Sequence, residues 1–374
     1  MKNILDKIIS FFRDLSDRQS QSVLGIDISS SSIKLVQLKK KRGKAILQTY
    51  GEISLGPYAG TEPGRATKLS VQKTAEALND LLKEAKTTTI NCGVSIPMTA
   101  SLIKIVEIPF ISEKQLKDVV PIEARKYIPV PITEVLLDWR IVPDEKDFLG
   151  EEKNEGGKIN IMLVAIHKEI VSMFQEIVEK VGLQTTFFEI EIFSAARSIL
   201  DRGIKPVLVF DFGASTTKLY IVERGIVQVS HIINRGSQDI TLAISKSFGM
   251  SIAEAEEIKR NYGIRSDIGA DITANNVSNT SAIIEYIFSE TEQMVIEYQT
   301  KNNKVISEIV LTGGGSLLKG LQEMAQDRFK ILVTMANPFK KVETPAFLED
   351  LLQGAGPEFA VAVGVALRKL EEEG

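Results

Sequence analysis

The chain has 374 residues, of which 44% are hydrophobic and 25% charged, a composition ordinary for a globular protein of two domains or one large two-lobed unit. A formal net charge of −4 argues against a nucleic-acid-binding protein. With one cysteine, Cys92, and two histidines far apart, the sequence excludes a disulfide framework or a zinc cluster within a single chain.

Residues 1–15 carry apolar side chains at helical spacing with charged side chains between them, which predicts an amphipathic helix. The polar stretch 16–22 separates this helix from the rest of the chain. Acidic residues interrupt the apolar stretch, so a secretory signal fits poorly, and no run approaches the roughly 18 apolar residues that span a bilayer. Two interpretations stay open. The helix lies on a membrane or in a partner's groove, or it packs on its own domain or frays.

The first predicted β-hairpin combines an aspartate near a strand end with a turn rich in hydroxyl groups. Apolar strands are expected at 23–28 and 33–38, and a third strand at 45–53 follows a charged turn. Asp27 precedes the turn and Lys34 follows it. The turn itself consists of Ser29, Ser30, Ser31 and Ser32. One such turn is weak support for a function, because an aspartate followed by small residues often only makes a turn.

Residues 93–185 form a predicted insertion with strands and helices of its own. A capping pattern at Ser112, with an acid in the first turn, predicts a helix that continues to about residue 129. The other expected elements are strands at 93–97, 101–106, 135–142 and 160–166 and a closing helix at 167–181. A charged loop, 144–158, separates the last two strands.

The second half of the chain repeats the first hairpin. Three strands are expected, at 207–212, 219–222 and 226–233. The spacing from Asp211 to Lys218 equals that of the aspartate and the lysine in the first hairpin. The turn residues are Gly213, Ala214, Ser215, Thr216 and Thr217. Two such turns facing each other across a cleft would hold phosphates through backbone N–H groups and hydroxyls, and their aspartates would hold a hydrated Mg²⁺.

Two later segments fit the base and the ribose of a nucleotide. A helix expected at 253–263 carries Glu256 and Lys259 one turn apart on one face, although this pair could also be an ordinary surface ion pair. A strand at 309–312 runs into a glycine turn, where the backbone can approach a flat ligand closely. The turn residues are Gly313, Gly314, Gly315 and Ser316. Alone, this turn could be a plain linker between a strand and a helix.

Together these segments resemble the actin, Hsp70 and sugar-kinase superfamily, whose two halves each start with an Asp-x-Gly-[Ser/Thr] phosphate hairpin. Segment 211–217 has this glycine, whereas Ser29 replaces it in the first hairpin. Glycine there permits positive φ and close phosphate approach, so Ser29 affects tight turnover more than binding. Gly236 and Asp239 match a Gly-Gly-x-Asp segment of the superfamily, with Ser237 for one glycine. The resemblance implies an α/β, actin-like (ribonuclease H-like, duplicated) bilobal ATPase fold.

The insertion narrows this resemblance to two families. Its strand–helix–strand–strand organisation is similar to the SHS2-like subdomain shared by the cell-division protein FtsA and the type IV pilus assembly family PilM. Segments 123–129, 336–339 and 359–367 resemble PilM specifically. The acidic end, 368–374, would be repelled by anionic lipid, unlike the membrane-binding tail of FtsA. PilM is therefore favoured, with an FtsA-like protein that tethers a filament to the membrane as the alternative.

The resemblance to PilM implies an ATP-binding component of a type IV pilus platform, or of a related type II secretion or competence system, with at most slow ATPase activity. It implies a cytoplasmic protein at the inner face of the cytoplasmic membrane. The implied partner is the cytoplasmic tail of a PilN-like inner-membrane protein, in a groove by the insertion near residues 116–138. Other platform proteins, self-association and, through the N-terminal helix, the membrane surface are further expected contacts.

The implied cofactors are ATP and Mg²⁺, with the metal held by Asp27 and Asp211 through water. No catalytic residue is identified. The expected nucleotide-binding residues are Asp27, Ser29, Ser30, Ser31, Ser32, Lys34, Asp211, Gly213, Ala214, Ser215, Thr216, Thr217, Gly236, Asp239, Glu256, Lys259, Gly313, Gly314, Gly315 and Ser316.

The expected domain division follows from these segments. The N-terminal helix and linker take 1–20. The first lobe takes 21–92 and, after the insertion 93–185, the return segment 186–205 and the C-terminal helix 355–374. The second lobe takes 206–250 with its hairpin, the outer helices 251–302, and 303–354 with the glycine turn.

Overall fold

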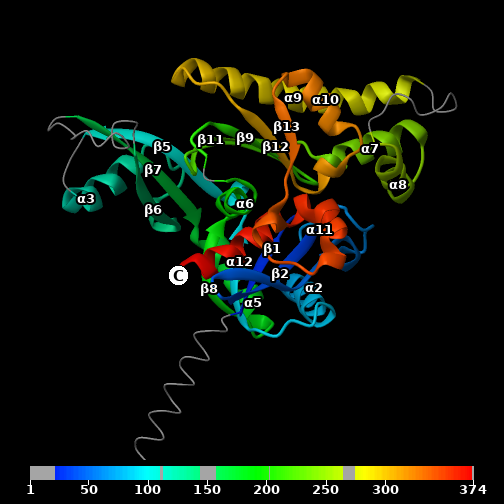
Figure 1. The fold of residues 1–374 in the computed structure, drawn as a ribbon, viewed down its shortest axis with the longest axis horizontal. Helices are drawn as coiled ribbons and strands as arrows, with labels where there is room; N and C mark the ends of the chain where they lie inside the picture. Colours follow the sequence, from blue (N-terminus) through cyan, green and yellow to red (C-terminus); the bar gives the residue numbers. More distant parts are fainter. Residues whose placement is uncertain (1–21, 110–112, 144–156, 202, 264–273, 373–374) are drawn as a thin grey trace, which may run out of the picture.

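The computed structural model describes residues 22–109, 113–143, 157–201, 203–263 and 274–372. The predicted N-terminal helix and most of the predicted charged loop at 144–158 lie outside these residues. The described chain forms two lobes, each built on a five-stranded sheet, and a smaller sheet that projects to one side (Figure 1).

The first sheet has the strand order β3-β2-β1-β4-β8. β1 (Ser22–Ile28), β2 (Ser32–Lys41) and β3 (Lys44–Ser54) form an antiparallel meander. β4 (Asn91–Ile96) and β8 (Gln184–Ile190) continue the sheet parallel to β1. β1 and most of β2 are buried, and continuous apolar runs of this kind are typical of a sheet covered by helices on both faces.

The second sheet has the strand order β11-β10-β9-β12-β13. Its meander consists of β9 (Val207–Phe212), β10 (Thr217–Glu223) and β11 (Ile226–Ile233), and β12 (Glu308–Thr312) and β13 (Leu332–Met335) run parallel to β9. Strand order and strand directions are the same as in the first sheet. The structure therefore confirms the duplication predicted from the sequence.

Two helices lie between the sheets (Figure 1). α12 (Ala360–Glu372) packs on β1 and β2, and α12 and α6 (Glu191–Ile199) together pack on β9 and β10. Where α6 and α12 meet, Gly364 lies against the backbone of Ser194, and a Cβ at that position would come closer than 3.0 Å to the Ser194 carbonyl oxygen. The two lobes are thus joined through a tightly packed helix pair.

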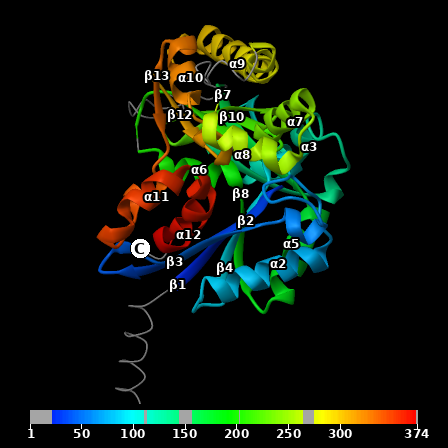
Figure 2. The ribbon, with the colours of Figure 1, turned by 90° about the vertical axis from the view of Figure 1, so that its right-hand side faces the viewer.

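Helices also cover the outer faces of the two large sheets. α2 (Val71–Glu84) and α5 (Lys168–Lys180) pack on the first sheet. The second sheet is covered by α7 (Ser237–Phe248), α8 (Ile252–Tyr262), α9 (Ala274–Asn302) and α10 (Leu321–Phe329). Figure 2 shows α9 and α10 at the opposite end of the molecule from α2 and α5.

The smaller sheet has the order β5-β7-β6 and packs one face against α3 (Glu113–Ala124). Its strands are β5 (Ser101–Pro109), β6 (Val135–Val142) and β7 (Lys158–His167), in the predicted places. α3 ends before the predicted residue 129. Ile128 precedes Pro129, and a residue before proline is disfavoured in the helical conformation.

Packing shifts two of the expected boundaries. α5 lies in the core of the first sheet, and the segment 336–359 packs with β1, β2 and α12 through Phe339, Val342 and Leu352. We therefore propose that the inserted subdomain spans about 97–167 and that the second lobe ends near 335.

Candidate functional site

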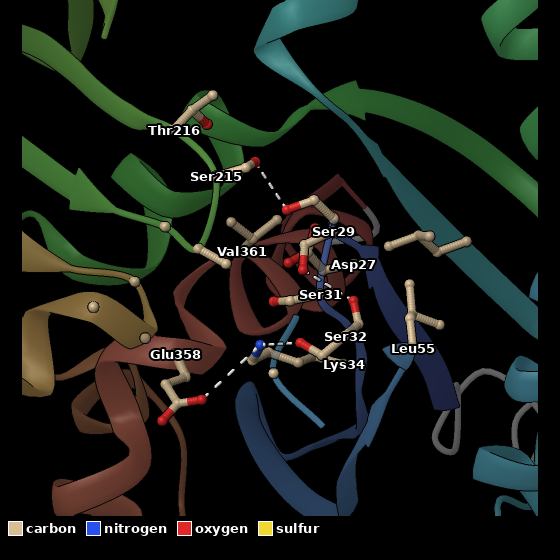
Figure 3. A pocket seen from close by; sticks show the side chains of 18 of the residues that line it. Asp27, Ser29, Ser31, Ser32, Lys34, Leu55, Ser215, Thr216, Glu358 and Val361 are labelled. Carbon is tan, nitrogen blue, oxygen red and sulfur yellow. Dashed lines mark hydrogen bonds and ion pairs between the residues drawn. The ribbon is translucent and has the colours of Figure 1, made fainter. Parts of the chain in front are cut away.

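A cleft of about 990 Å³ lies between the two lobes. Its walls come from the β1–β2 hairpin, the β9–β10 hairpin, the glycine turn after β12, and the side of α8 that carries Glu256, Lys259 and Arg260. Figure 3 shows Ser215 of the second hairpin facing the turn of the first. The segments that the sequence marked for phosphate and base binding therefore line one cavity.

The two hairpin turns share one backbone geometry. The Ser29 N–H donates to the Ser32 carbonyl at 3.0 Å, and the Gly213 N–H donates to the Thr216 carbonyl at 3.0 Å. Neither Ser29 nor Gly213 has a positive φ. The turn at Ser29 therefore closes without a positive φ, and the expected effect of Ser29 on nucleotide turnover stays a prediction.

The turns also meet across the cleft. Ser30 Oγ and Ser215 Oγ lie 3.0 Å apart, so one hydroxyl from each lobe points toward the same spot. A second contact between the lobes joins the Ala66 N–H to Gln238 Oε1 at 2.6 Å. The two turns are thus joined across the cleft by a hydrogen bond between one hydroxyl from each lobe.

Asp27 is a buried carboxylate at the floor of the cleft. It is 7% exposed and accepts a hydrogen bond from Ser95 Oγ at 2.6 Å. Burial raises its pKa above the ordinary aspartate value, although the Ser95 hydroxyl and the Lys34 ammonium oppose the shift. The folded chain therefore holds a proton on Asp27 more tightly than an unfolded chain does.

Asp27→Asn is expected to stabilise the folded protein at neutral pH, because asparagine has no charge to bury. Folding raises the pKa of the Asp27 carboxyl group. The free energy of unfolding therefore falls as the pH rises from the pKa in the unfolded chain to the pKa in the folded chain, and this loss is complete above the folded-state pKa. Urea unfolding of both proteins at about pH 4 and about pH 8 should show a smaller difference between the two pH values in the variant. Equal differences would contradict this expectation, and Asp327→Asn, at an exposed carboxylate, should change neither value.

Asp211 occupies the position in the second hairpin that corresponds to Asp27, and it forms an ion pair with a lysine. Lys218 Nζ lies 3.2 Å from Asp211 Oδ2 and 2.7 Å from Glu191 Oε2. Glu191, the first residue of α6, also accepts the Met98 N–H at 2.7 Å. Burial alone would lower the pKa of Lys218, but Asp211 and Glu191 outweigh it and raise that pKa. No local motif marks Glu191, because it lies in an apolar run and only the fold brings it to Lys218.

Lys34 does not repeat this arrangement. Its ammonium donates to Ser32 Oγ at 2.6 Å and pairs with Glu52 at 2.8 Å and Glu358 at 4.0 Å (Figure 3). Burial opposes the charged form of Lys34, yet the two glutamates raise its pKa. Lys34 lines the cleft, but its charge is already shared with two carboxylates. The predicted phosphate contact of Lys34 would have to compete with them.

The α8 side of the cleft holds a small charged network. Lys259 Nζ lies 2.7 Å from Glu256 Oε2, Arg260 Nε lies 2.9 Å from Glu256 Oε1, and Thr241 Oγ1 donates to Glu256 at 2.6 Å. Burial lowers the pKa of Lys259. Across from it, Gly313 has φ +82°, and a Cβ there would come closer than 3.0 Å to Asp211 Oδ1. The glycine turn thus brings bare backbone next to the second hairpin.

Four of the predicted residues lie outside the lining of the cleft and shape its loops instead. Thr217 Oγ1 donates to the Arg235 carbonyl at 2.8 Å, and Ser316 Oγ donates to the Gly313 carbonyl at 2.6 Å. Asp239 accepts the Gly236 N–H at 2.8 Å, at the start of α7. Gly236 lies so close to the Ala214 carbonyl that a side chain would clash. That these four contact the nucleotide stays a prediction, and in the structure they hold the turns around the cleft.

The described residues contain no group of three or more His, Cys, Asp or Glu side chains arranged to hold a metal ion. Among the helices that the structure describes, none is long and apolar enough to cross a bilayer.

Comparison with known proteins shows which proteins share this architecture. The family model described as type IV pilus assembly protein PilM matches residues 25–370. The cell division protein FtsA of Neisseria meningitidis serogroup B is 25% identical, with 95% of this chain and 92% of FtsA covered. FtsA of Streptococcus pneumoniae serotype 2 is 22% identical, with 86% of this chain and 77% of that protein covered.

Solved structures give the same answer for the fold. A PilM–PilN type IV pilus biogenesis complex matches with a TM-score of 0.78 and 25% identity, over 93% of this chain and 98% of that one. MreB5 of Spiroplasma citri bound to ADP matches with a TM-score of 0.51 and 12% identity, over 94% of this chain and 97% of MreB5. These matches confirm the predicted actin-like, two-lobed α/β fold.

Proposed function

The chain belongs to the type IV pilus assembly protein PilM family, and on this premise we propose that it is the ATP-binding cytoplasmic component of an inner-membrane assembly platform. The platform builds type IV pili or serves a related type II secretion or competence system. The partner is the cytoplasmic tail of a PilN-like membrane protein, and the match to a PilM–PilN complex supports this choice.

ATP binding is carried by one observation, the meeting of the two hairpin turns across the cleft. Ser30 and Ser215 converge from opposite lobes, and each turn offers backbone N–H groups beside its hydroxyls. Phosphate groups are held by such concave sets of donors. The ribose and base would then extend along the glycine turn toward Glu256 and Lys259.

The side chains fit ATP better than they fit a shared Mg²⁺. Asp27 and Asp211 both line the cleft, as a hydrated Mg²⁺ between them would require. However, Asp211 already pairs with the buried Lys218 ammonium, and Asp27 accepts the Ser95 hydroxyl. The predicted metal site between the two aspartates therefore does not fit this arrangement, and any Mg²⁺ would be carried by the phosphates themselves.

The nucleotide would act by setting the angle between the lobes. The inserted sheet reaches the second lobe, because β5 lies beside β11. A change in lobe angle would therefore change the surface that the insert offers to the PilN-like tail. This is a shift between two populated arrangements and needs no power stroke.

Equilibrium binding of a fluorescent ATP analogue to the full chain, with competition by ATP and ADP, tests the nucleotide part. Saturable binding that ATP displaces supports the proposal, and no binding at millimolar nucleotide would refute it. Phosphate release measured against an Asp211→Ala control separates a scaffold from an ATPase, since turnover well above the control contradicts the scaffold. Light scattering on ATP addition would reveal a filament.

Binding to the tail peptide is expected to depend on the insert face around residues 116–138. Ile122 and Leu136 are apolar residues of this region that are 60% and 47% exposed. Val135 and Leu137 pack with α3, so Leu136 lies on the opposite face of the inserted sheet. Ile122→Asp and Leu136→Asp are therefore tested separately, and the one on the docking face should weaken binding of the PilN-like peptide by about tenfold or more, measured by fluorescence anisotropy. Ile296→Asp, at an equally exposed apolar residue of α9, is the matched control.

An FtsA-like role in cell division is the alternative function, and the sequence similarity to FtsA proteins supports it. The same anisotropy measurement with the C-terminal peptide of a tubulin-like division protein distinguishes the two. Tight binding of that peptide, with no binding of the PilN-like tail, would replace the pilus assignment by a division assignment.

A further inference from the structure

We propose that a second cavity, at the end of the second lobe away from the nucleotide cleft, binds the phosphate headgroup of an anionic membrane lipid. Three exposed aliphatic side chains beside this cavity, Ile204, Val305 and Leu332, enter the lipid surface. The site is separate from the cleft between the lobes and from the predicted N-terminal helix. It needs neither the nucleotide nor the PilN-like tail, so it goes beyond the proposed function.

The cavity has a volume of about 520 Å³, within the range of about 300–1,000 Å³ that small-molecule sites occupy. Its walls are the segment between α6 and β9, the turn between β10 and β11, the starts of β9 and β12, and residues 334–337 and 340–341. The hairpin turn and the glycine turn of the nucleotide cleft follow the other ends of β9 and β12. The two cavities therefore lie at opposite ends of the second sheet.

The lining of this cavity is basic, although the chain as a whole has a formal charge of −4. Asp201 lies 3.6 Å from Lys340, and Glu308 accepts the Thr334 hydroxyl at 2.6 Å. Four cationic side chains face these two carboxylates, which leaves a formal excess of two positive charges. The cationic residues of the lining are Lys205, Arg224, Lys340 and Lys341. Such an excess favours an anionic group in the cavity.

Two exposed aliphatic side chains lie at this end of the sheet because the strands β9 and β12 begin side by side. The carbonyl of Pro206 accepts the N–H of Ser307 at 2.9 Å, which joins the two segments just before their strands. Ile204 and Val305 each lie two residues before this pair, and they are 72% and 75% exposed. Ile204 also lines the cavity.

The third aliphatic side chain, Leu332, is 58% exposed and begins β13. Leu332 lies opposite Glu308 in the parallel register, and Thr334, two residues further along, donates to Glu308. Alternate residues of a strand point to the same face, so Leu332 lies on the face of the sheet that carries the cavity. Basic side chains and aliphatic side chains thus occur together at one end of the lobe, as on proteins that lie on an anionic bilayer.

The aliphatic side chains favour a lipid surface over an acidic peptide. Val305 and Leu332 stand out from the surface beside the cavity, whereas a bound peptide needs apolar pockets for its own side chains. Protruding aliphatic groups can enter the boundary between headgroups and acyl chains, while neighbouring lysines stay among the headgroups.

Co-sedimentation of the full chain with lipid vesicles tests the site. We expect the chain to bind vesicles of phosphatidylcholine with about one third phosphatidylglycerol roughly tenfold or more tightly than vesicles of phosphatidylcholine alone. Binding to the anionic vesicles should weaken as the salt concentration rises, because salt screens the attraction between lysines and headgroups.

Lys205→Gln/Lys340→Gln removes two positive charges from the cavity. This double variant should bind the anionic vesicles about tenfold or more weakly, because each lysine at a membrane surface adds to the attraction. The matched control Lys83→Gln/Lys246→Gln removes two exposed lysines from the last turns of α2 and α7, and it should bind like the natural chain.

Ile204→Ser/Leu332→Ser removes apolar surface without changing the charge and should also weaken vesicle binding by about tenfold or more. Ile296→Ser/Leu351→Ser, at two exposed apolar residues elsewhere, is its control. All these positions are exposed, so thermal unfolding should show that every variant folds. Each variant keeps residues 1–21, so any membrane binding by the predicted N-terminal helix is the same in all of them.

Each outcome supports or overturns a stated part of the proposal. Equal binding of the natural chain to vesicles with and without phosphatidylglycerol overturns the headgroup site, as does unchanged binding by the folded Lys205→Gln/Lys340→Gln variant. Unchanged binding by the folded serine variant Ile204→Ser/Leu332→Ser overturns the insertion of the aliphatic side chains. If the natural chain binds a fluorescent oligoglutamate peptide through Lys205 and Lys340 but binds no vesicles, the cavity takes an acidic peptide and the lipid site is refuted.

Discussion

Gly364→Ala is expected to lower the midpoint of thermal unfolding by roughly 1–4 °C. A Cβ at position 364 would lie closer than 3.0 Å to the carbonyl carbon and oxygen of Ser194, which cannot rotate away as a side-chain tip could. α6 and α12 would have to separate, and overpacking of this kind costs about 1–3 kcal/mol. Differential scanning calorimetry measures the shift.

Gly354→Ala is the matched control for this substitution. Gly354 also lies in a helix, α11 (Glu349–Ala355), but nothing lies within 4 Å of the Cβ that alanine would add. Alanine should therefore leave stability unchanged or raise it by about 0.5–1 kcal/mol, because glycine is a poor helix former. If the two variants unfold at the same temperature, close helix packing between the lobes is not what Gly364 provides.

Ser215→Glu is expected to weaken ATP binding by about 100-fold or more. The Ser215 hydroxyl lies 3.0 Å from Ser30 Oγ, in the space where we place the phosphates. A carboxylate introduced there would face the triphosphate at short range, and two like charges about 4 Å apart repel by about 4 kcal/mol at an effective dielectric constant of about 20. Competition with the fluorescent ATP analogue measures the loss.

Ser215→Gln separates charge from size in this experiment, because glutamine has the shape of glutamate without its charge. We expect the glutamine variant to bind ATP much more tightly than the glutamate variant. Equal losses in both would mean that the added bulk, and not repulsion of phosphate, closes the cleft. The phosphates would then lie elsewhere than between the two turns.

The parts of the site that the sequence could predict are those built from neighbouring residues. Each hairpin has its strands, turn and aspartate within one short segment, so the alternation of apolar and small residues was enough to find Asp27 and Asp211. The repeat of that segment predicted the two-lobed fold. The strand order in both sheets confirms it.

The parts that escaped prediction depend on contacts between distant segments. Glu191 reaches Lys218 only because α6 is packed between the sheets, and Glu358 reaches Lys34 only because the C-terminal segment returns to the first lobe. Lys34 and Lys218 look equivalent in the sequence, yet their partners differ because of Glu52 and Ile232 on the third strand of each sheet. No spacing rule within a hairpin contains that information.

Ser29 stands where the superfamily's motif has glycine, and its expected effect on turnover stays a prediction. The glycine in the superfamily's motif implies a special backbone conformation, but the turn here closes through an ordinary hydrogen bond from residue 29 to residue 32, at φ values open to any residue. The motif therefore predicts phosphate-binding chemistry at this turn but no backbone strain.

The position of α12 fixes the order in which the lobes can be completed during synthesis. The main core of the second lobe is built from residues between Leu208 and Val333, one continuous stretch. The faces of β1 and β2 in the first lobe are instead covered by Phe339, Leu352 and α12, which are synthesised after the core of the second lobe. The first lobe is thus completed after the second, and until then the buried strands of the first lobe expose an apolar face.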